Sequence, residues 1–225
     1  MASPCADNCG IQLPGGHMPR RTRLVLPGVP LHIVQRGHNR QPCFHTRSDY
    51  LVYMDKLAMH ASTVGCAIHA YVLMTNHVHM LASFDDVRGP AHLLRLLAQQ
   101  YSTYLNRRLG KSGSTWEGRY WSCPVPTEQY LFICQRYIEL NPVRASIVDR
   151  KEDYQWSSYR QNAGIDADRL VTPHELYSRL GTNETERQTG YRGLFAHELT
   201  SAELEEIRGG LKNVLPKTRV VKTPE

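Results

Sequence analysis

The stretch CAIHAYVLMTNHVHMLASF, residues 66–84, decides the fold because it has the pattern of a β-hairpin. Residues 66–74 are apolar and rich in strand-forming side chains, and residues 77–84 alternate between apolar and polar positions. Thr75 and Asn76 lie between them and suit a tight turn. Residues two apart in a strand point to the same side, so His77 and His79 are expected to share a face.

Segments on both sides of the hairpin complete an alternating order of strands and helices. We expect a strand at 31–37, a helix at 49–63 with Ser48 as its cap, a helix from Pro90 to about Leu109, an edge strand at 120–125, and a helix that begins after Thr127 and stops before Pro142. The order β-α-β-β-α-β, followed by a further helix, is that of the split βαβ motif. The sequence therefore predicts an α+β fold with a ferredoxin-like core, in which a four-stranded antiparallel sheet carries helices on one face.

The composition of the chain is typical of a folded protein that does not enter a membrane. It has 225 residues, of which 41% are hydrophobic and 21% charged. No apolar run approaches the roughly 18 residues of a membrane span, and the start lacks the features of a signal peptide. For these two reasons we expect a cytoplasmic protein. Its six cysteines form no CxxC pair, so no zinc ribbon is indicated and the cysteines are expected to be reduced. Residues 1–17 are rich in Gly, Pro and small residues, which predicts a disordered extension and makes Met18 an alternative start.

The C-terminal third differs from the expected main domain, which spans residues 18–150. The stretch WSSYR at 156–160 is interpreted as a docking segment. TPHE from Thr172 and TSAE from Thr200 have the pattern of capping boxes, so each is expected to open a helix. We therefore expect residues 151–225 to form this docking segment and a small helical appendage.

Positive charge is concentrated in the main domain. Residues 18–150 contain 16 Lys and Arg against 8 Asp and Glu, whereas residues 151–225 contain 11 against 12. Almost all of the basic residues in the first segment are arginines, which suit bidentate contact with phosphate oxygens. This distribution favours a nucleic-acid partner, although charge alone fits a solvated basic face equally well.

Four residues carry the candidate chemistry. Neutral imidazole is a common metal ligand, so His77 and His79 are either a metal-binding pair or two structural side chains. Tyr137 and Asn141 are four apart on the last predicted helix of the core, which places them on one face, one turn from each other. A helical tyrosine is usually a packing residue and an asparagine before proline usually ends a helix, so neither residue indicates a function alone.

Taken together, residues 18–160 resemble the REP-associated tyrosine transposases, within the HUH single-tyrosine transposases. The resemblance rests on His77-Val78-His79, on Tyr137 in RYIELNPVRA, and on the stretches VQRGHNR, LNRRLGKSGSTWEGRY and WSSYR. Members of this family cut and rejoin single-stranded DNA at or near short palindromic hairpins on a ferredoxin-like core. The resemblance therefore implies a Mg²⁺- or Mn²⁺-dependent enzyme whose partner is single-stranded DNA with hairpins.

The resemblance also implies roles for individual residues. Tyr137 is the expected nucleophile, which forms a 5′-phosphotyrosine, and His77, His79 and Asn141 are the expected metal ligands. The candidate DNA contacts are Arg20, Arg21, Arg23, Arg36, Asn39, Arg40, Arg107, Arg108, Arg119 and Arg144.

Two positions depart from the family pattern. His38 stands where relatives usually carry asparagine, and Trp121 replaces a usual basic residue. Three alternatives to a transposase stay open: a DNA-binding protein that keeps the fold without catalysis, a relaxase or replication initiator of the HUH type, and a metal-dependent phosphohydrolase. The sequence does not distinguish a monomer from a homodimer.

Overall fold

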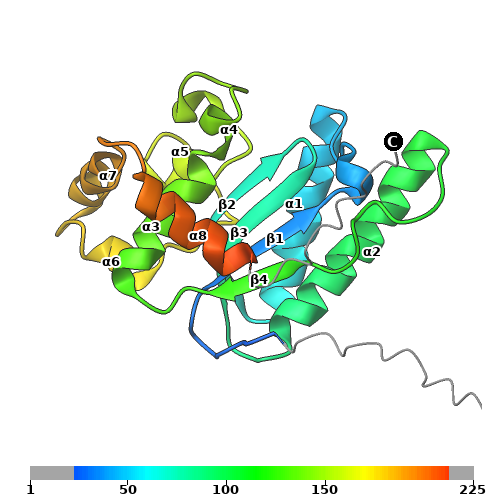
Figure 1. The fold of residues 1–225 in the computed structure, drawn as a ribbon, viewed down its shortest axis with the longest axis horizontal. Coiled ribbons are helices and arrows are strands. Elements are labelled where there is room, and N and C mark those ends of the chain that lie inside the picture. The colour runs from blue at the N-terminus through cyan, green and yellow to red at the C-terminus, as the bar shows by residue number, and fades with distance from the viewer. Residues whose placement is uncertain (1–22, 213–225) are drawn as a thin grey trace, which may run out of the picture.

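A four-stranded antiparallel sheet forms the centre of the protein (Figure 1). The computed structural model describes residues 23–212, in which the strands are β1 (Leu31–Arg36), β2 (Cys66–Met74), β3 (His77–Phe84) and β4 (Trp121–Pro124). Their order is β2-β3-β1-β4, because β1 pairs with both β3 and β4. This topology is that of the ferredoxin-like split βαβ core, so the predicted fold class is confirmed.

Helices cover both faces of this sheet and not one face as expected, because the helix after the last strand packs on the side opposite the two crossover helices. The crossover helices α1 (Arg47–Thr63) and α2 (Gly89–Leu109) pack together on one side and form the expected helical layer. Helix α3 (Glu128–Glu139) follows the last strand and packs across β2 and β3 on the other side, with α8 (Ser201–Lys212) beside it over β4. Because helices cover both faces, residues 68–74 of β2 form an unbroken buried run.

Capping residues set the ends of the core helices. Thr127 accepts a hydrogen bond from the backbone N–H of Tyr130 and starts α3, as predicted. Helix α1 begins after Thr46, because Asp49 completes a capping box with Thr46. The expected cap at Ser48 is wrong for this reason.

Short helices make up most of the C-terminal region: α4 (Asn141–Arg144), the 3-10 turn η2 (Lys151–Asp153), α5 (Tyr159–Asn162), α6 (Glu175–Ser178) and α7 (Glu184–Gly193). Thr200 and Glu203 form the predicted capping box at the start of α8. Helix α6 does not use the expected box at Thr172. Its cap is His174, whose ring Nδ1 accepts the backbone N–H of Leu176. Helix α7 was not expected from the sequence.

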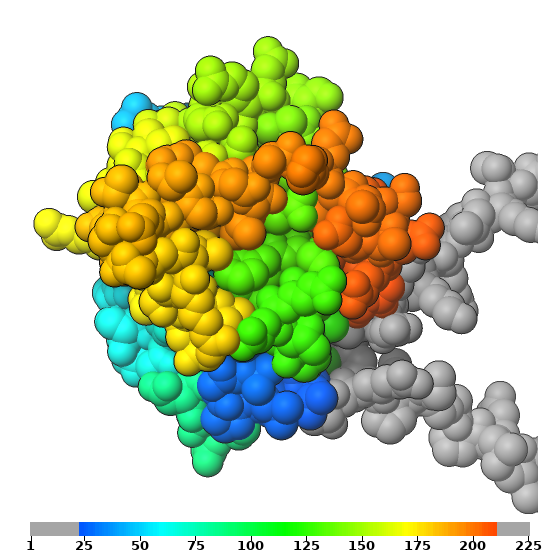
Figure 2. Space-filling model, turned by 90° about the vertical axis from the view of Figure 1, so that its left-hand side faces the viewer, coloured from blue at the N-terminus to red at the C-terminus, as the bar shows by residue number. Residues whose placement is uncertain are grey.

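The C-terminal region shares the core of the sheet. The backbone N–H of Leu73 donates to the carbonyl of Trp156 at 2.9 Å, and the N–H of Ser158 donates to the carbonyl of Tyr71 at 3.0 Å. The main hydrophobic cluster also includes side chains from beyond residue 160, namely Leu170, Val171, Leu176 and Ile207. Figure 2 shows the yellow and orange C-terminal segments on either side of a green strip from the middle of the chain. The domain boundary at residue 150 stays a prediction.

Some sequence-based expectations fall outside the described residues. These are the disorder of residues 1–17 and the DNA contacts of Arg20 and Arg21. Within residues 23–212, none of the helices has the length and apolar character needed to span a membrane.

Candidate active site

Strand β3 brings two imidazoles to the side of the sheet that α3 covers. The rings of His77 and His79 lie 5.0 Å apart between centroids, at an interplanar angle of 78°. In the antiparallel register with β1, His77 lies opposite Arg36 and His79 lies opposite Val34. His77 is half-buried and His79 is 5% exposed. The two rings therefore share one face of the sheet, beside the end of β1.

Asn76 fixes which nitrogen of His77 carries the proton. The Nδ2 amide of Asn76 donates to the carbonyl of Arg40 at 3.0 Å, which turns its Oδ1 toward Nδ1 of His77 at 2.7 Å. An amide oxygen only accepts hydrogen bonds, so Nδ1 of neutral His77 carries the proton and Nε2 presents a lone pair. This Nε2 has no hydrogen-bond partner among residues 23–212 and is not fully buried, so it reaches solvent.

His79 is held by a third histidine, His32 of β1. Nδ1 of His79 lies 2.9 Å from Nε2 of His32, and the two rings stack with centroids 5.2 Å apart. His32 is 1% exposed, and its Nδ1 is fully buried with no partner in the described part of the chain. Nε2 of His79 is also without a partner there, but it is not fully buried and so reaches solvent.

Burial keeps these three imidazoles neutral. It lowers the pKa of His32 to about 3, and together with the charge of Arg36 it lowers the pKa of His77 to about 4. Burial also holds the pKa of His79 well below its usual value, with contributions from the other two histidines and from Arg36 and Arg144. Neutral rings keep a lone pair available at pH 7, which metal ligation requires.

Helix α3 carries Tyr137 to the same place. Its ring centroid lies 5.9 Å from the ring of His79 and 5.9 Å from the ring of His32, both in edge-on contacts. The side chain is mostly buried, but its hydroxyl is not fully buried and forms no hydrogen bond with any residue from 23 to 212. The ring is therefore fixed by packing, while its oxygen is left without a partner in the described residues.

Asn141 offers an amide oxygen one turn beyond Tyr137. Its Nδ2 donates to the carbonyls of Tyr137 at 3.0 Å and Ile138 at 3.4 Å. Because both partners are acceptors, the NH₂ group must face the end of α3 and Oδ1 must face away from it. Within the described residues Oδ1 has no partner, and it is not fully buried.

The chemistry of these atoms suits a divalent metal ion. Two imidazole nitrogens and an amide oxygen are neutral donors of the kinds that divalent ions accept. Among residues 23–212, no group of three or more His, Cys, Asp or Glu side chains is arranged to hold a metal. An ion at this place would therefore be held by His77 and His79, with oxygen donors such as Asn141, water or a phosphate completing its coordination.

Two arginines give the cluster a positive surrounding. Arg36 lies opposite His77 on the neighbouring strand. Arg144 is exposed on α4, and its guanidinium carbon lies 4.6 Å from the ring centroid of Tyr137. Both charges act on His79, which places positive potential where a phosphate would approach.

The loop after β1 continues this positive edge. The backbone N–H of Gly37 donates to the carbonyl of Asn76 at 2.8 Å, which ties the loop to the turn before His77. A Cβ atom at Gly37 would lie 2.3 Å from the carbonyl oxygen of Gln41, so the close approach requires glycine. Asn39 and Arg40 follow in the turn η1 (His38–Arg40), exposed and left-handed, with φ of 51° and 59°.

The other candidate DNA contacts lie on α2 or next to the start of β4. Arg107 and Arg108 line a groove between α1 and α2, on the opposite side of the sheet. Arg23 donates to the carbonyl of Tyr120 and lies over its ring. Arg119 is exposed in the loop before β4.

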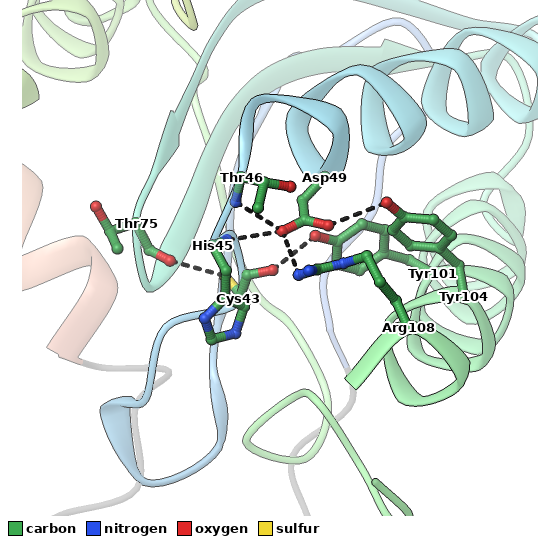
Figure 3. Close-up of polar contacts among 8 residues, drawn as sticks. All are labelled: Cys43, His45, Thr46, Asp49, Thr75, Tyr101, Tyr104 and Arg108. Carbon is green, nitrogen blue, oxygen red and sulfur yellow. Dashed lines mark hydrogen bonds and ion pairs between the residues drawn. The ribbon is translucent and has the colours of Figure 1, made fainter. Parts of the chain in front are cut away.

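Arg108 has a structural partner, the buried carboxylate of Asp49 (Figure 3). Asp49 is fully buried and accepts four hydrogen bonds of 2.7–3.0 Å, from the backbone N–H groups of His45 and Thr46 and from the side chains of Tyr104 and Arg108. Burial raises the pKa of Asp49, but these donors outweigh it and lower the pKa. In the same loop, the N–H of Cys43 donates to the carbonyl of Thr75 at 2.9 Å, so the network also supports the β2–β3 turn.

Sequence reasoning did not single out two residues of the cluster, His32 and Asn76. A signal for His32 was present in LHIVQRG, because strand alternation puts His32 and Arg36 on one face. It becomes informative only once β1 is known to pair with β3. In the sequence Asn76 has the character of a turn residue, and its bond to His77 depends on the carbonyl of Arg40, 36 residues away.

Comparisons with known proteins identify the family of this chain. The family described as IS200-like transposases matches residues 27–141, just over half of the 225-residue chain. The chain belongs to the IS200-like transposase family. The matched segment includes β1 to β4, both histidines of β3, Tyr137 and Asn141. No curated protein matches this transposase.

Two solved structures resemble this transposase. One is a REP-associated tyrosine transposase bound to a REP hairpin, with a TM-score of 0.56 and 18% identity, covering 70% of this chain and 96% of that chain. The other is a provisionally assigned transposase from Deinococcus radiodurans R1, with a TM-score of 0.39 and 19% identity, covering 53% of this chain and 95% of that chain. The first likeness supports the fold, and the TM-score of the second is too low to support it further.

Proposed function

We propose that this transposase cuts and rejoins single-stranded DNA beside short hairpins, with Tyr137 as the nucleophile. The observation that carries the proposal is the contact between Tyr137 and the histidines, in which a ring packed against His79 and His32 carries a hydroxyl without a partner among residues 23–212. A tyrosine buried only for stability usually has its hydroxyl bonded. Tyr154 is such a case, since its hydroxyl donates to the carbonyl of Leu73 at 2.7 Å.

The chemistry needs no external energy source. The Tyr137 oxygen, after giving up its proton, attacks the phosphorus, the bond from phosphorus to the 3′-oxygen breaks, and the leaving 3′-oxygen takes up a proton. DNA then stays joined to Tyr137 through its 5′-phosphate. A phenol is more acidic than an aliphatic alcohol, so tyrosine leaves readily when a DNA 3′-hydroxyl attacks the same phosphorus. Cleavage and rejoining together replace one DNA phosphodiester bond with another, so no external energy is needed.

The surrounding residues position the phosphate. His77 and His79, with Asn141, would hold Mg²⁺ or Mn²⁺, which supplies Lewis-acid stabilisation of charge on a phosphate oxygen when bound. Arg36 and Arg144 neutralise the phosphate on the protein side. The packing of Tyr137 against His79 and His32 keeps the attacking oxygen in place.

The substrate class follows from two observations. The structure with this fold that was solved with a REP hairpin supports a hairpin ligand for this chain as well. The candidate site is a small set of side chains between one helix and the sheet, and unstacking duplex DNA costs a few kcal/mol per step. An unpaired flank next to a hairpin avoids that cost, so we expect the scissile bond to lie in such a flank.

A covalent adduct tests the proposal. The full chain is incubated with a labelled hairpin that carries an unpaired flank, in the presence of Mn²⁺, and the products are separated in SDS. Tyr137→Phe removes one oxygen and should abolish the adduct while hairpin affinity changes less than about twofold. Tyr130→Phe, seven residues earlier on α3, is the matched control and should keep the adduct.

The position of the label and the form of the DNA test the details. Label on the 3′ side of the break should stay with the protein, and label on the 5′ side should be released. A fully paired duplex should be cut at least about tenfold more slowly because of the unstacking cost. Hairpin binding without any adduct in the unmodified protein would favour a DNA-binding role without catalysis.

A further inference from the structure

We propose that His32 is a positioning residue, which accepts the Nδ1 proton of His79 and so directs the Nε2 lone pair of His79 toward the metal site. This inference rests on the proposed function, because it assumes that His79 ligates a metal. The carrying observation is the 2.9 Å contact between Nδ1 of His79 and Nε2 of His32, formed between two buried rings on neighbouring strands.

His77 shows what such a ligand requires. Its Nδ1 proton goes to Asn76, whose orientation is fixed by the carbonyl of Arg40, and its Nε2 is left with a lone pair. Ligating histidines almost always donate their second ring N–H in this way, which sets both the tautomer and the ring orientation. Within the described residues, His32 is the only hydrogen-bond partner of the His79 ring.

Two neutral imidazoles can share this contact in two ways. If His32 donates, the remaining proton of His79 sits on Nε2 and blocks ligation. If His79 donates, its Nε2 is free, and the remaining proton of His32 sits on Nδ1. In the described part of the chain, Nδ1 of His32 is fully buried without a partner.

Nδ1 of His32 is unpaired in both arrangements, as an N–H in the one that can bind a metal and as a lone pair in the other, so a metal at Nε2 of His79 decides between them. A buried polar atom without a partner is uncommon and requires an explanation. His32 also supplies the partner that the buried Nδ1 of His79 needs, which an apolar side chain at this position could not supply. A positioning role explains why a buried histidine with one unpaired nitrogen is the second residue of β1, where its ring also lies 5.9 Å from the ring of Tyr137.

The test measures metal binding without DNA. Mn²⁺ affinity of the full chain is determined by titration calorimetry for the unmodified protein and for His32→Leu, His32→Gln and His79→Ala. Leucine removes the acceptor, and the expected loss of Mn²⁺ affinity is about 10- to 100-fold. The side-chain oxygen of glutamine can take the place of Nε2, so His32→Gln should stay within about threefold of the unmodified protein. Melting temperatures of the four proteins report whether each variant is folded.

The tautomer of His79 is measured independently of any variant at position 32. Imidazole ¹⁵N spectra of the unmodified protein with Mg²⁺ should show the proton of His79 on Nδ1. A proton on Nε2 in that state, or equal Mn²⁺ affinities for His32→Leu and the unmodified protein, overturns the proposal. Equal losses of Mn²⁺ affinity in His32→Leu and His32→Gln also overturn it, because glutamine should restore the acceptor and with it the binding.

Two other outcomes concern the proposed function. Unchanged Mn²⁺ binding in His79→Ala overturns the assignment of His79 as a metal ligand. Tight Mn²⁺ binding that depends on His32, without a DNA adduct, contradicts only the proposed catalysis.

Discussion

The guanidinium of Arg144 lies over the ring of Tyr137, with its carbon 4.6 Å from the ring centroid. The contact follows from the end of α3. Pro142 cannot continue the helix, so the chain turns into the short helix α4, which returns Arg144 toward Tyr137 seven residues after it. The arrangement places an exposed cation beside the proposed nucleophile, where it can meet the phosphate that the nucleophile attacks.

Arg144→Ala should slow formation of the covalent adduct about fivefold, because it removes a cation that can meet the attacked phosphate, and an exposed charge pair contributes about 0.2–1 kcal/mol. The melting temperature should change by less than about 2 °C, since the side chain is exposed. Single-turnover assays on the labelled hairpin measure the rate. Arg95→Ala, an exposed arginine on α2, is the control and should leave the rate unchanged. An equal effect of the two substitutions would contradict a local role for Arg144.

The candidate DNA contacts divide by the side of the sheet on which they lie. Arg36 is beside His77, whereas Arg107 lines the groove between α1 and α2. Arg36→Ala should weaken hairpin binding about tenfold, because a charge-assisted contact contributes about 1.5 kcal/mol, and should reduce the salt slope by about 0.7. Arg107→Ala should stay within about twofold. Fluorescence anisotropy at several salt concentrations measures both, and a larger loss for Arg107→Ala would place the DNA on the α1–α2 face.

Local signals in the sequence predicted much of this fold. The alternation in residues 77–84, the Thr75-Asn76 turn and the cap at Thr127 act over a few residues, and each has the expected form. The expected cap at Ser48 is wrong because another local signal is stronger. Asp49 is three residues after Thr46, the spacing of a capping box, so Thr46 caps the helix.

The rest of the site depends on contacts between distant segments. His32 and His79 are 47 residues apart, and their contact requires that β1 pair with β3. Tyr191 donates to Glu139 across 52 residues, and no periodicity in either segment indicates it. Strand order and docking of the C-terminal region decide such contacts, and they are properties of the whole chain.

Arg40 combines a strained backbone with a candidate phosphate contact. Its φ of 59° is in the left-handed region, which costs a side-chain-bearing residue about 1–2 kcal/mol. Arg40→Gly should therefore raise the free energy of unfolding by about 0.5–1 kcal/mol, after the greater freedom of glycine in the unfolded chain is subtracted. It should also weaken hairpin binding. Arg40→Ala should weaken binding equally without the gain in stability, which urea unfolding and anisotropy together can show.

Glu139 is a fully buried carboxyl group two residues from Tyr137. It accepts hydrogen bonds from Ser158 at 2.6 Å, from Tyr191 at 2.6 Å and from Asn162 at 3.2 Å. It therefore connects α3 to α5 and α7. Burial raises its pKa to about 7, although the three donors and the charge of Lys151 oppose this rise.

The shift of Glu139 predicts that the protein loses stability between about pH 4.5 and pH 7. Below pH 4.5 the group is protonated in both states and costs nothing. As the pH rises, the unfolded chain releases the proton first while the folded protein still holds it, so the free energy of unfolding falls until the folded group ionises near pH 7. A pKa shift from 4.5 to about 7 sets an upper limit of about 3 kcal/mol on this loss in the free energy of unfolding.

Glu139→Gln stays neutral at every pH. The stability of this variant relative to the unmodified protein should therefore increase from pH 5 to pH 8 when urea unfolding is followed by circular dichroism. Glu128→Gln removes an exposed carboxylate from the same helix and controls for the lost charge. Parallel pH profiles for the unmodified protein and Glu139→Gln would show that Glu139 is already ionised in the folded protein at pH 5.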